Sequence, residues 1–224
     1  LANLATWAQK WFSEQLNETG EGKSVGLGYM RQRGFGDAML SDFAIGYCPD
    51  SPWSEEGALA QAAPEAIPAA SQGTMNNVAM GAAGENGWDY YETMAGGTGA
   101  HARGPGLSAV HSHMTNTRMT DPEVLEQRFP VRVEGFAIRQ GSGGHGRHWG
   151  GEGIERRLRF LEPMTVTVLT SHRVQRPHGA AGGEPGQPGE NWVERADGSR
   201  ERLAGNDQTE VAAGDQVIML TPGG

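Results

Sequence analysis

The stretch VRVEGFAIR (residues 131–139), followed by IERRLRF (154–160) and MTVTVL (164–169), decides the fold class of this chain. Apolar and polar residues alternate through 131–139 on both sides of Gly135, which predicts a strand interrupted by a bulge. The two later runs predict two further strands, with Leu161-Glu162-Pro163 turning between them. This part of the chain is therefore expected to form a sheet.

The sequence beyond these strands continues the β pattern. Residues 191–203 read as a hairpin around Asp197-Gly198, and residues 209–220 read as another around Ala213-Gly214-Asp215. We therefore expect the last third of the chain to be mainly β-structure.

The first fifty residues have a different pattern. Apolar residues recur at helical spacing from Leu4 to Leu16, which predicts an amphipathic helix. Ser24 is expected to cap a second short helix, and Asp37 to begin a third. The predicted fold class is therefore α+β, with a short N-terminal helical unit followed by a glycine-rich mixed body that is β-rich toward the C-terminus.

Composition limits the classes of function. The chain has 224 residues, 35 Gly, 12 Pro and a formal net charge of −9, which argues against a general affinity for nucleic acid or for an anionic membrane. Cys48 is the one cysteine, so the sequence allows no intrachain disulfide and no cysteine-based zinc site. Without a membrane span or signal-peptide pattern, we expect a cytoplasmic protein. The start at Leu1 and the end in a loop suggest a fragment.

The densest polar run is HSHMTNTRMTDPE (residues 111–123). On a strand, His111 and His113 would point to the same face, so that both could contact one metal or phosphate. Two histidines alone are a weak metal signal, and hydrogen bonding to structure or substrate is the preferred interpretation. Asn116 can hold both edges of an amide, and Arg118 can bind a carboxylate or phosphate through two donors. These four residues are the candidate catalytic residues, and no metal ligand is assigned.

The end of that run has a structural interpretation. Thr120-Asp121-Pro122-Glu123 matches a capping box, in which the Thr120 hydroxyl and the Glu123 carboxylate bond free amides at a helix start. Pro122 suits the first turn because its missing N–H is not needed there. We therefore expect Thr120 and Glu123 to cap a helix and to take no part in catalysis.

A glycine-rich run, GSGGHGRHWGGEG, occupies residues 141–153. Glycines permit positive φ angles and let successive amides converge on an anion. The candidate substrate- or anion-binding residues in this run are Ser142, Gly143, Gly144, His145 and Arg147. The order matches neither a P-loop nor a dinucleotide fingerprint, and tight connections between strands are the alternative interpretation.

Several motifs together resemble one family. They are PAASQGTMNN (68–77), YYET (90–93), HSHMTNTR (111–118), GSGG (141–144) and TPGG (221–224), and in this order they resemble the hydantoinase B/5-oxoprolinase family. The form TDPEVLE (120–126) is most similar to the 5-oxoprolinase branch. The resemblance implies a hydrolase that opens 5-oxoproline or a hydantoin-type ring with ATP and a divalent cation, paired with a hydantoinase A-type subunit or domain.

The same resemblance limits what this chain can do alone. The family's B subunit is longer, and its metal-associated N-terminal segment has no counterpart here. His148-Trp149-Gly150-Gly151-Glu152 stands where relatives usually have Arg before the glycine pair and Asp after it. We therefore expect no activity, and no bound cofactor, in the fragment by itself. The alternative is a non-catalytic assembly module of such an enzyme.

Residues 1–50 resemble the helical segment that follows the zinc-binding domain of bacterial DNA primase. The motifs are NETGEGK (17–23), YMRQRGF (29–35) and FAIGY (43–47), whereas the zinc ligands and the acidic catalytic core of primase are missing. The predicted organisation is a primase-like segment (1–50), a junction (51–63) and the hydantoinase B/5-oxoprolinase region (64–224). A chimeric reading frame or a divergent linker helix would explain it, and a primase-derived nucleic-acid-handling fragment is a further alternative.

Overall fold

The structure is a computed structural model that describes residues 2–42, 44–47, 75–84, 87–112, 115 and 117–224. The chain divides into two compact units, residues 1–62 and 63–224. Each unit has a hydrophobic cluster of its own.

The N-terminal unit is helical, as the sequence predicts. Its elements are α1 (Ala2–Glu18), a π-helical turn η1 (Gly22–Leu27), α2 (Gly28–Gln32) and α3 (Asp37–Asp42). Leu16, Leu27 and Leu40 form its small core. The prediction that Ser24 caps a helix is wrong, because the backbone is already helical at Glu21 and the Ser24 hydroxyl donates to the Glu21 carbonyl.

The C-terminal unit contains two antiparallel sheets. The four-stranded sheet has the order β2-β1-β5-β8, and the five-stranded sheet has the order β3-β4-β9-β6-β7. The strands are β1 (Asn76–Ala82), β2 (Trp88–Thr93), β3 (Val131–Arg139), β4 (Gly153–Phe160), β5 (Met164–Thr170), β6 (Glu190–Glu194), β7 (Arg200–Leu203), β8 (Asn206–Val211) and β9 (Gln216–Leu220).

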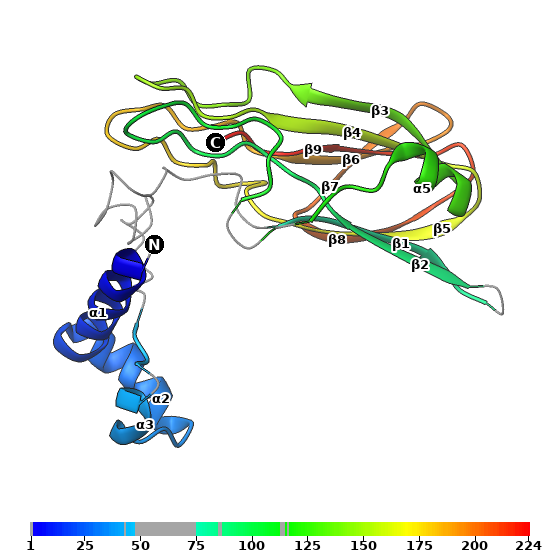
Figure 1. Cartoon of the computed structure of the whole chain (residues 1–224). Coiled ribbons are helices and arrows are strands. Elements are labelled where there is room, and N and C mark those ends of the chain that lie inside the picture. The colour runs from blue at the N-terminus through cyan, green and yellow to red at the C-terminus, as the bar shows by residue number, and fades with distance from the viewer. Residues whose placement is uncertain (1, 43, 48–74, 85–86, 113–114, 116) are drawn as a thin grey trace. The chain divides into compact units, whose positions relative to one another are not determined.

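The two sheets pack face to face through one core, with helix α5 (Pro122–Arg128) near one end (Figure 1). Alternation along each strand supplies this core, since Val166 and Val168 point inward from β5 while Thr165 and Thr167 point outward. Burying such side chains contributes about 1.5–3 kcal/mol each. Leu125 of α5 is fully buried in the same core.

The strand predictions are confirmed, but one pairing is wrong. The register of β3 against β4 shifts between Val133 and Gly135, which is the expected bulge. β6 and β7 form the expected hairpin, and Gly198 in its turn has a φ of +86°. Residues 209–220 are not a hairpin, because β8 pairs with β5 and β9 pairs with β4 and β6. The turn at Gly214 crosses from one sheet to the other.

Three glycine-rich loops meet at one end of the unit. The Gly106 N–H donates to the Trp149 carbonyl, the Gly151 N–H to the Thr98 carbonyl, and the Glu184 N–H to the His145 carbonyl. A Cβ added at Gly143 would lie 2.2 Å from the Gly150 carbonyl oxygen. Glycine is therefore needed at this position because two backbone segments approach closely.

Candidate functional site

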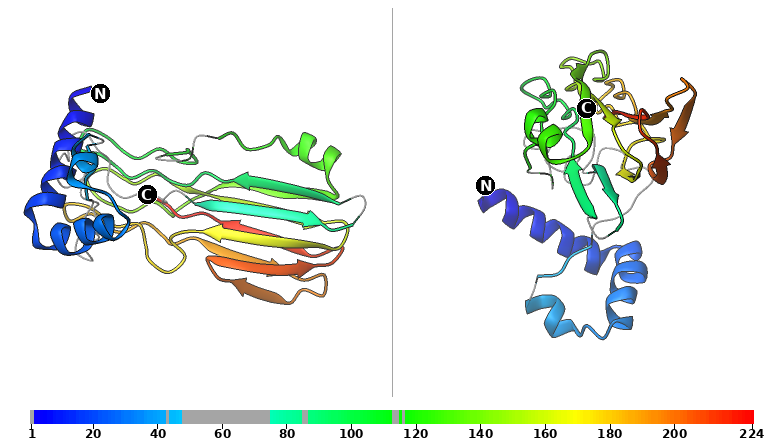
Figure 2. Two further views of the ribbon diagram at one scale, coloured as in Figure 1. Left: turned by 90° about the horizontal axis from the view of Figure 1, so that it is seen from below. Right: turned by 90° about the vertical axis from the view of Figure 1, so that its right-hand side faces the viewer.

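The polar run predicted to be functional follows β2 and leads into α5. The described parts of residues 94–121 run beside the strands toward α5 (Figure 2). Helix α5 begins at Pro122, and the Asp121 side chain caps it by accepting the Glu123 N–H at 2.9 Å. The helix start and the position of Pro122 therefore agree with the sequence prediction.

The capping-box prediction for Thr120 is wrong. The N-cap is Asp121, and Thr120 contacts strand β2 instead of the helix. Its backbone N–H donates to Glu92 Oε1 at 2.8 Å, and its hydroxyl accepts a hydrogen bond from the Tyr90 hydroxyl at 2.8 Å. Hydrogen bonds with the Glu92 carboxylate and the Tyr90 hydroxyl, both on β2, take the place of the expected bonds to the helix start. Thr120 therefore ties the polar run to the four-stranded sheet.

Glu92 belongs to a buried ion pair that joins the two sheets. Its Oε2 lies 3.1 Å from Nη2 of Arg156, which points inward from β4, and both side chains are almost completely buried. Burial also raises the pKa of the neighbouring Tyr90 to about 12, although its hydrogen bond to Thr120 works against that shift. The interior therefore holds Glu92, Arg156 and Tyr90 in one polar cluster.

His111 lies close enough to Glu92 for the negative charge of the carboxylate to act on its imidazole. Burial lowers the pKa of its imidazole below the ordinary value, and the negative charge of Glu92 opposes that shift. Both ring nitrogens are buried, and neither has a hydrogen-bond partner among the residues that the structure describes. Nη2 of Arg156 and Oε2 of Glu92 have their ion pair but no hydrogen bond within the described part of the chain, and Nε of Arg156 has no hydrogen bond there either. Orphaned buried polar atoms cost about 1–3 kcal/mol each, so this cluster calls for a functional explanation.

The other predicted residues of the run are only partly placed. Arg118 is exposed, two residues before Thr120. His111 lies outside any strand, so the shared-face argument for His111 and His113 has no strand to support it there. His113 and Asn116 fall outside the described residues.

The predicted anion nest is formed, and a carboxylate of the chain itself occupies it. Glu152 Oε2 accepts the Ser142 N–H at 2.6 Å, the Gly143 N–H at 2.9 Å and the Ser142 hydroxyl at 2.8 Å. Burial raises the pKa of Glu152, but these hydrogen bonds outweigh it and hold the pKa below its ordinary value. Of the predicted residues, His145 and Arg147 are exposed, and His145 stacks on Trp149 with ring centroids 4.4 Å apart. An external anion would have to compete with Glu152 for these amides.

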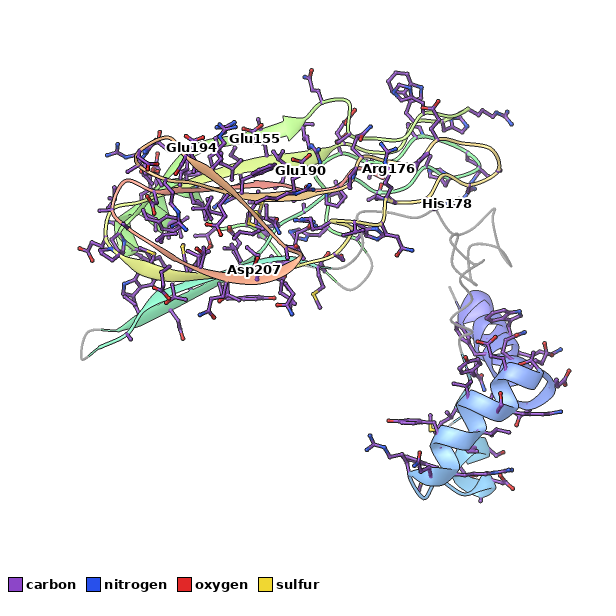
Figure 3. The ribbon with its side chains drawn as sticks, turned by 180° about the vertical axis from the view of Figure 1, so that it is seen from behind. Glu155, Arg176, His178, Glu190, Glu194 and Asp207 are labelled. Atoms are coloured by element: carbon purple, nitrogen blue, oxygen red, sulfur yellow. The ribbon has the colours of Figure 1, made fainter. Side chains whose placement is uncertain are left out.

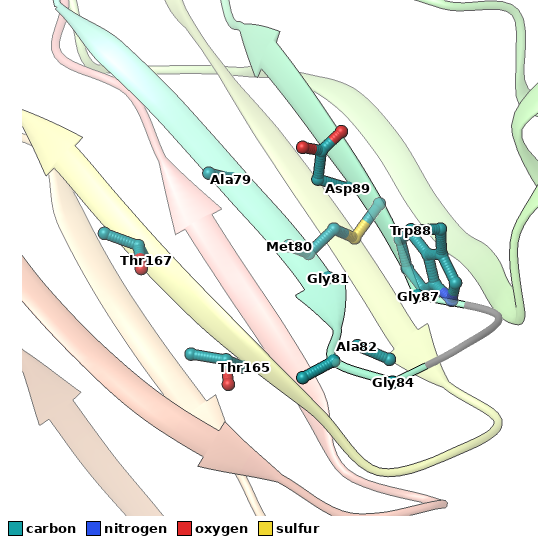
Figure 4. Close-up of a pocket in the computed structure, with 11 residues that line it drawn as sticks. Ala79, Met80, Gly81, Ala82, Gly84, Gly87, Trp88, Asp89, Thr165 and Thr167 are labelled. Atoms are coloured by element: carbon teal, nitrogen blue, oxygen red, sulfur yellow. The ribbon is translucent and has the colours of Figure 1, made fainter.

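A separate hollow of about 570 Å³ opens on the outer face of the four-stranded sheet, near the end of β1 and the start of β2 (Figure 4). Ala79, Gly81, Thr165 and Thr167 line it, with Asp89 as its one carboxylate among the lining residues. Small aliphatic and hydroxyl side chains with a single acid offer no pair for acid–base chemistry. This hollow is therefore a poor candidate for a catalytic site.

The described part of the chain contains neither a metal-binding cluster nor a membrane-spanning helix. No three His, Cys, Asp or Glu side chains gather there in a way that could hold a metal ion. None of the helices described has the length and apolar character needed to cross a bilayer. The divalent cation that the resemblance implies therefore has no fitting ligand set among these residues, and no chemical step is assigned to it here.

Sequence reasoning missed the residues at the centre of the cluster. Tyr90 and Glu92 stand inside the YYET motif, which supported the family resemblance without a role for either side chain. Arg156 had a usable signal, because alternation from Ile154 to Phe160 places it on the apolar, inward face of its strand. A buried arginine there requires a buried anion, which the structure supplies as Glu92.

Known proteins share this C-terminal unit. Residues 56–224 match the family model described as hydantoinase B/oxoprolinase. 5-oxoprolinase 1 of Arabidopsis thaliana is 46% identical over 156 residues, which are 70% of this chain and 12% of that protein. The 5-oxoprolinase of Dictyostelium discoideum is 43% identical over 154 residues, which are 69% of this chain and 12% of that protein.

A solved structure is similar over the same region. The crystal structure of the ATP-dependent caprolactamase from Pseudomonas jessenii has a TM-score of 0.59 and 28% identity, over 75% of this chain and 31% of that one. This chain thus spans only 12% of the length of the two curated relatives. The match to the family model covers well over half of the sequence. The chain belongs to the hydantoinase B/oxoprolinase family.

Proposed function

We propose that this chain is part of an ATP-dependent hydrolase that opens a cyclic amide, with 5-oxoproline preferred over hydantoin-type rings. Family membership and two relatives named 5-oxoprolinase support the reaction class. The caprolactamase similarity supports ATP-dependent opening of a cyclic amide. The observation that carries the proposal is the cluster of Glu92, Arg156 and Tyr90, which anchors Thr120, two residues after Arg118.

The residues of this run bind and orient the ring. Resonance stabilises an unstrained cyclic amide, and ATP in the complete enzyme supplies the activation that lets water attack the carbonyl carbon. Arg118 offers a guanidinium to the substrate carboxylate or to developing negative charge. Burial lowers the pKa of His111, which favours the neutral imidazole, a form that can donate one hydrogen bond and accept another. Asn116 and His113 complete the proposed catalytic set.

The glycine-rich loop has a smaller part in the proposal. Because Glu152 already accepts the amides of Ser142 and Gly143, we limit external anion contacts to His145 and Arg147. Ser142, Gly143 and Gly144 make no external contact in this proposal, because their amides already donate to Glu152 and to the Gly224 carbonyl.

The complete enzyme requires more than this chain. We propose a hydantoinase A-type subunit or domain as the partner that brings ATP, with a divalent cation bound outside the described residues. The proposed location is the cytoplasm, where ATP is available. Because the chain spans 12% of its curated relatives, the isolated fragment should not couple ATP hydrolysis to ring opening.

Arg118→Ala in a complete enzyme that carries this segment tests the catalytic proposal. We expect kcat/KM for 5-oxoproline with ATP to fall roughly 10²–10³-fold, the usual cost of losing a donor aimed at developing charge. Arg132→Ala is the matched control, since Arg132 is also exposed and lies on β3, away from the polar run in the sequence. Near-normal kcat/KM in Arg118→Ala would favour the non-catalytic assembly module instead.

A further inference from the structure

The Glu92–Arg156 pair is unusual because it is buried between the two packed sheets, which together form a β-sandwich. Arg156 shares the inward face of β4 with Ile154 and Leu158, and its side chain is 1% exposed. Desolvating two charges costs about as much as their attraction returns, so a buried ion pair adds little net stability. What such a pair does provide is a fixed orientation of each partner.

Glu92 links Arg156 to Thr120 in the polar run, because each of its carboxylate oxygens contacts one of these residues. Its Oε2 faces Arg156 at 3.1 Å, while its Oε1 accepts the Thr120 N–H at 2.8 Å. The Tyr90 hydroxyl bonds the side chain of the same threonine at 2.8 Å. Glu92 therefore holds the backbone of Thr120, and Tyr90 holds its side chain, both from strand β2. Arg118 lies two residues away on this anchored backbone.

Among the described residues, Glu92 is the acceptor for the Thr120 N–H, whereas Tyr90 bonds only the Thr120 hydroxyl. The Thr120 N–H precedes the helix cap at Asp121, so no helical carbonyl accepts it. His111 also lies near Glu92, close enough for the carboxylate to act on its imidazole. One carboxylate therefore contacts or influences both ends of residues 111–120.

We propose that Glu92 is a positioning residue, held by Arg156, which sets the placement of residues 117–120 and with it the reach of Arg118 toward the substrate. Glu92 touches no reacting atom in this assignment. The inference rests on the proposed function, because it concerns how that site is assembled.

Paired substitutions separate anchoring from stability. Glu92→Met with Arg156→Met removes both charges and the acceptor for Thr120, and leaves an apolar pair of similar volume that keeps the core filled. Glu92→Gln with Arg156→Met also removes both charges but keeps a carbonyl oxygen for the Thr120 N–H. The control is Glu190→Gln with Arg139→Met, which breaks the Glu190–Arg139 pair at 3.3 Å in the five-stranded sheet (Glu190 is labelled in Figure 3). Neither residue supplies a hydrogen bond to Thr120.

Hydrogen exchange in the whole 224-residue chain measures the anchoring directly. In the double methionine variant, we expect the Thr120 amide to exchange about tenfold faster or more, while the amides of Val166 and Val168 in β5 stay protected. In the glutamine–methionine variant, the side chain at position 92 keeps an acceptor for Thr120 but loses Arg156, so the Thr120 amide should exchange faster than in the parent and slower than in the double methionine variant. In the control, Thr120 should exchange as in the parent. An unchanged Thr120 amide in the double methionine variant would overturn the proposal.

Turnover in a complete enzyme measures the consequence. The double methionine variant should lose roughly 10–100-fold in kcat at saturating substrate, because misplaced binding groups act on the chemical step. The glutamine–methionine variant should lose less kcat than the double methionine variant, because it keeps the acceptor for the Thr120 N–H. Faster exchange with unchanged kcat would reduce Glu92 to a structural role and contradict the inference. If the parent enzyme showed no ATP-dependent ring opening, the proposed function would fail, while the exchange result would still decide whether Glu92 holds Thr120.

Discussion

The Glu152 side chain occupies the anion-binding amides of the glycine-rich loop, which the sequence alone would assign to an external ligand. Glycines in residues 141–144 correctly predict converging amides, but the sequence does not say which anion they bind. The answer depends on a carboxylate eleven residues after Gly141, brought back by the return of the chain into β4. The local glycine pattern therefore predicts the converging amides, but only the three-dimensional structure shows that Glu152 is the anion they bind.

Glu152→Gln should make the chain less stable at neutral pH and flatten its acid response. The pKa of Glu152 is lowered in the folded state, so its contribution is complete above the ordinary pKa of 4.5 and is lost as pH falls through the folded value. We expect a loss of about 1–3 kcal/mol at pH 7, as for hydrogen bonds to a charged group. Urea unfolding between pH 7 and pH 3 measures it, with exposed Glu162→Gln as the control. Equal pH dependence in both variants would refute this.

At the scale of elements, the sequence predicts where the strands lie better than it predicts which strands pair with each other. Alternation identifies β4 and β5 because each turns one face to the core and the other toward solvent, whereas β3 keeps this pattern only before Gly135. Sheet membership depends on long-range packing, which is why residues 209–220 were expected to be a hairpin although β8 and β9 lie in different sheets. The same limit applied to Thr120, whose hydrogen bonds come from residues 28 and 30 positions earlier in the chain.

Helix α5 offers a test of which residue is the cap. Asp121→Ala should destabilise the chain by about 1 kcal/mol, because the free Glu123 N–H loses its acceptor. Glu123→Ala should cost less, since the predicted capping box is not formed. Thermal unfolding monitored by circular dichroism compares the two variants. A larger loss in Glu123→Ala than in Asp121→Ala would restore the capping-box interpretation.

At the scale of the whole molecule, two separate cores correspond to two compact units. The change in composition along the sequence predicted a helical part and a β-rich part. The primase resemblance of residues 1–50 stays a prediction, because helical structure alone is shared by many unrelated segments.

Removing residues 1–62 should leave the sandwich nearly as stable as before. Its core is built from residues of the second unit, so we expect the melting temperature of residues 63–224 to change by no more than ~2–4 °C. Differential scanning calorimetry of the truncated and full chains tests this. A drop of about 10 °C or more would mean that the first unit supports the sandwich core.

The position of β9 has a consequence for how the protein is made. β9 is the last described strand to be synthesised, yet it lies between β4 and β6 and joins the β3–β4 hairpin to the β6–β7 hairpin. Both hairpins can form early from neighbouring residues, but the sheet cannot close until residues 216–220 leave the ribosome. Pairings between such distant segments fold slowly, on the scale of milliseconds to seconds. Until then the inner faces of both hairpins stay open to water, which makes the nascent chain a natural client for chaperones.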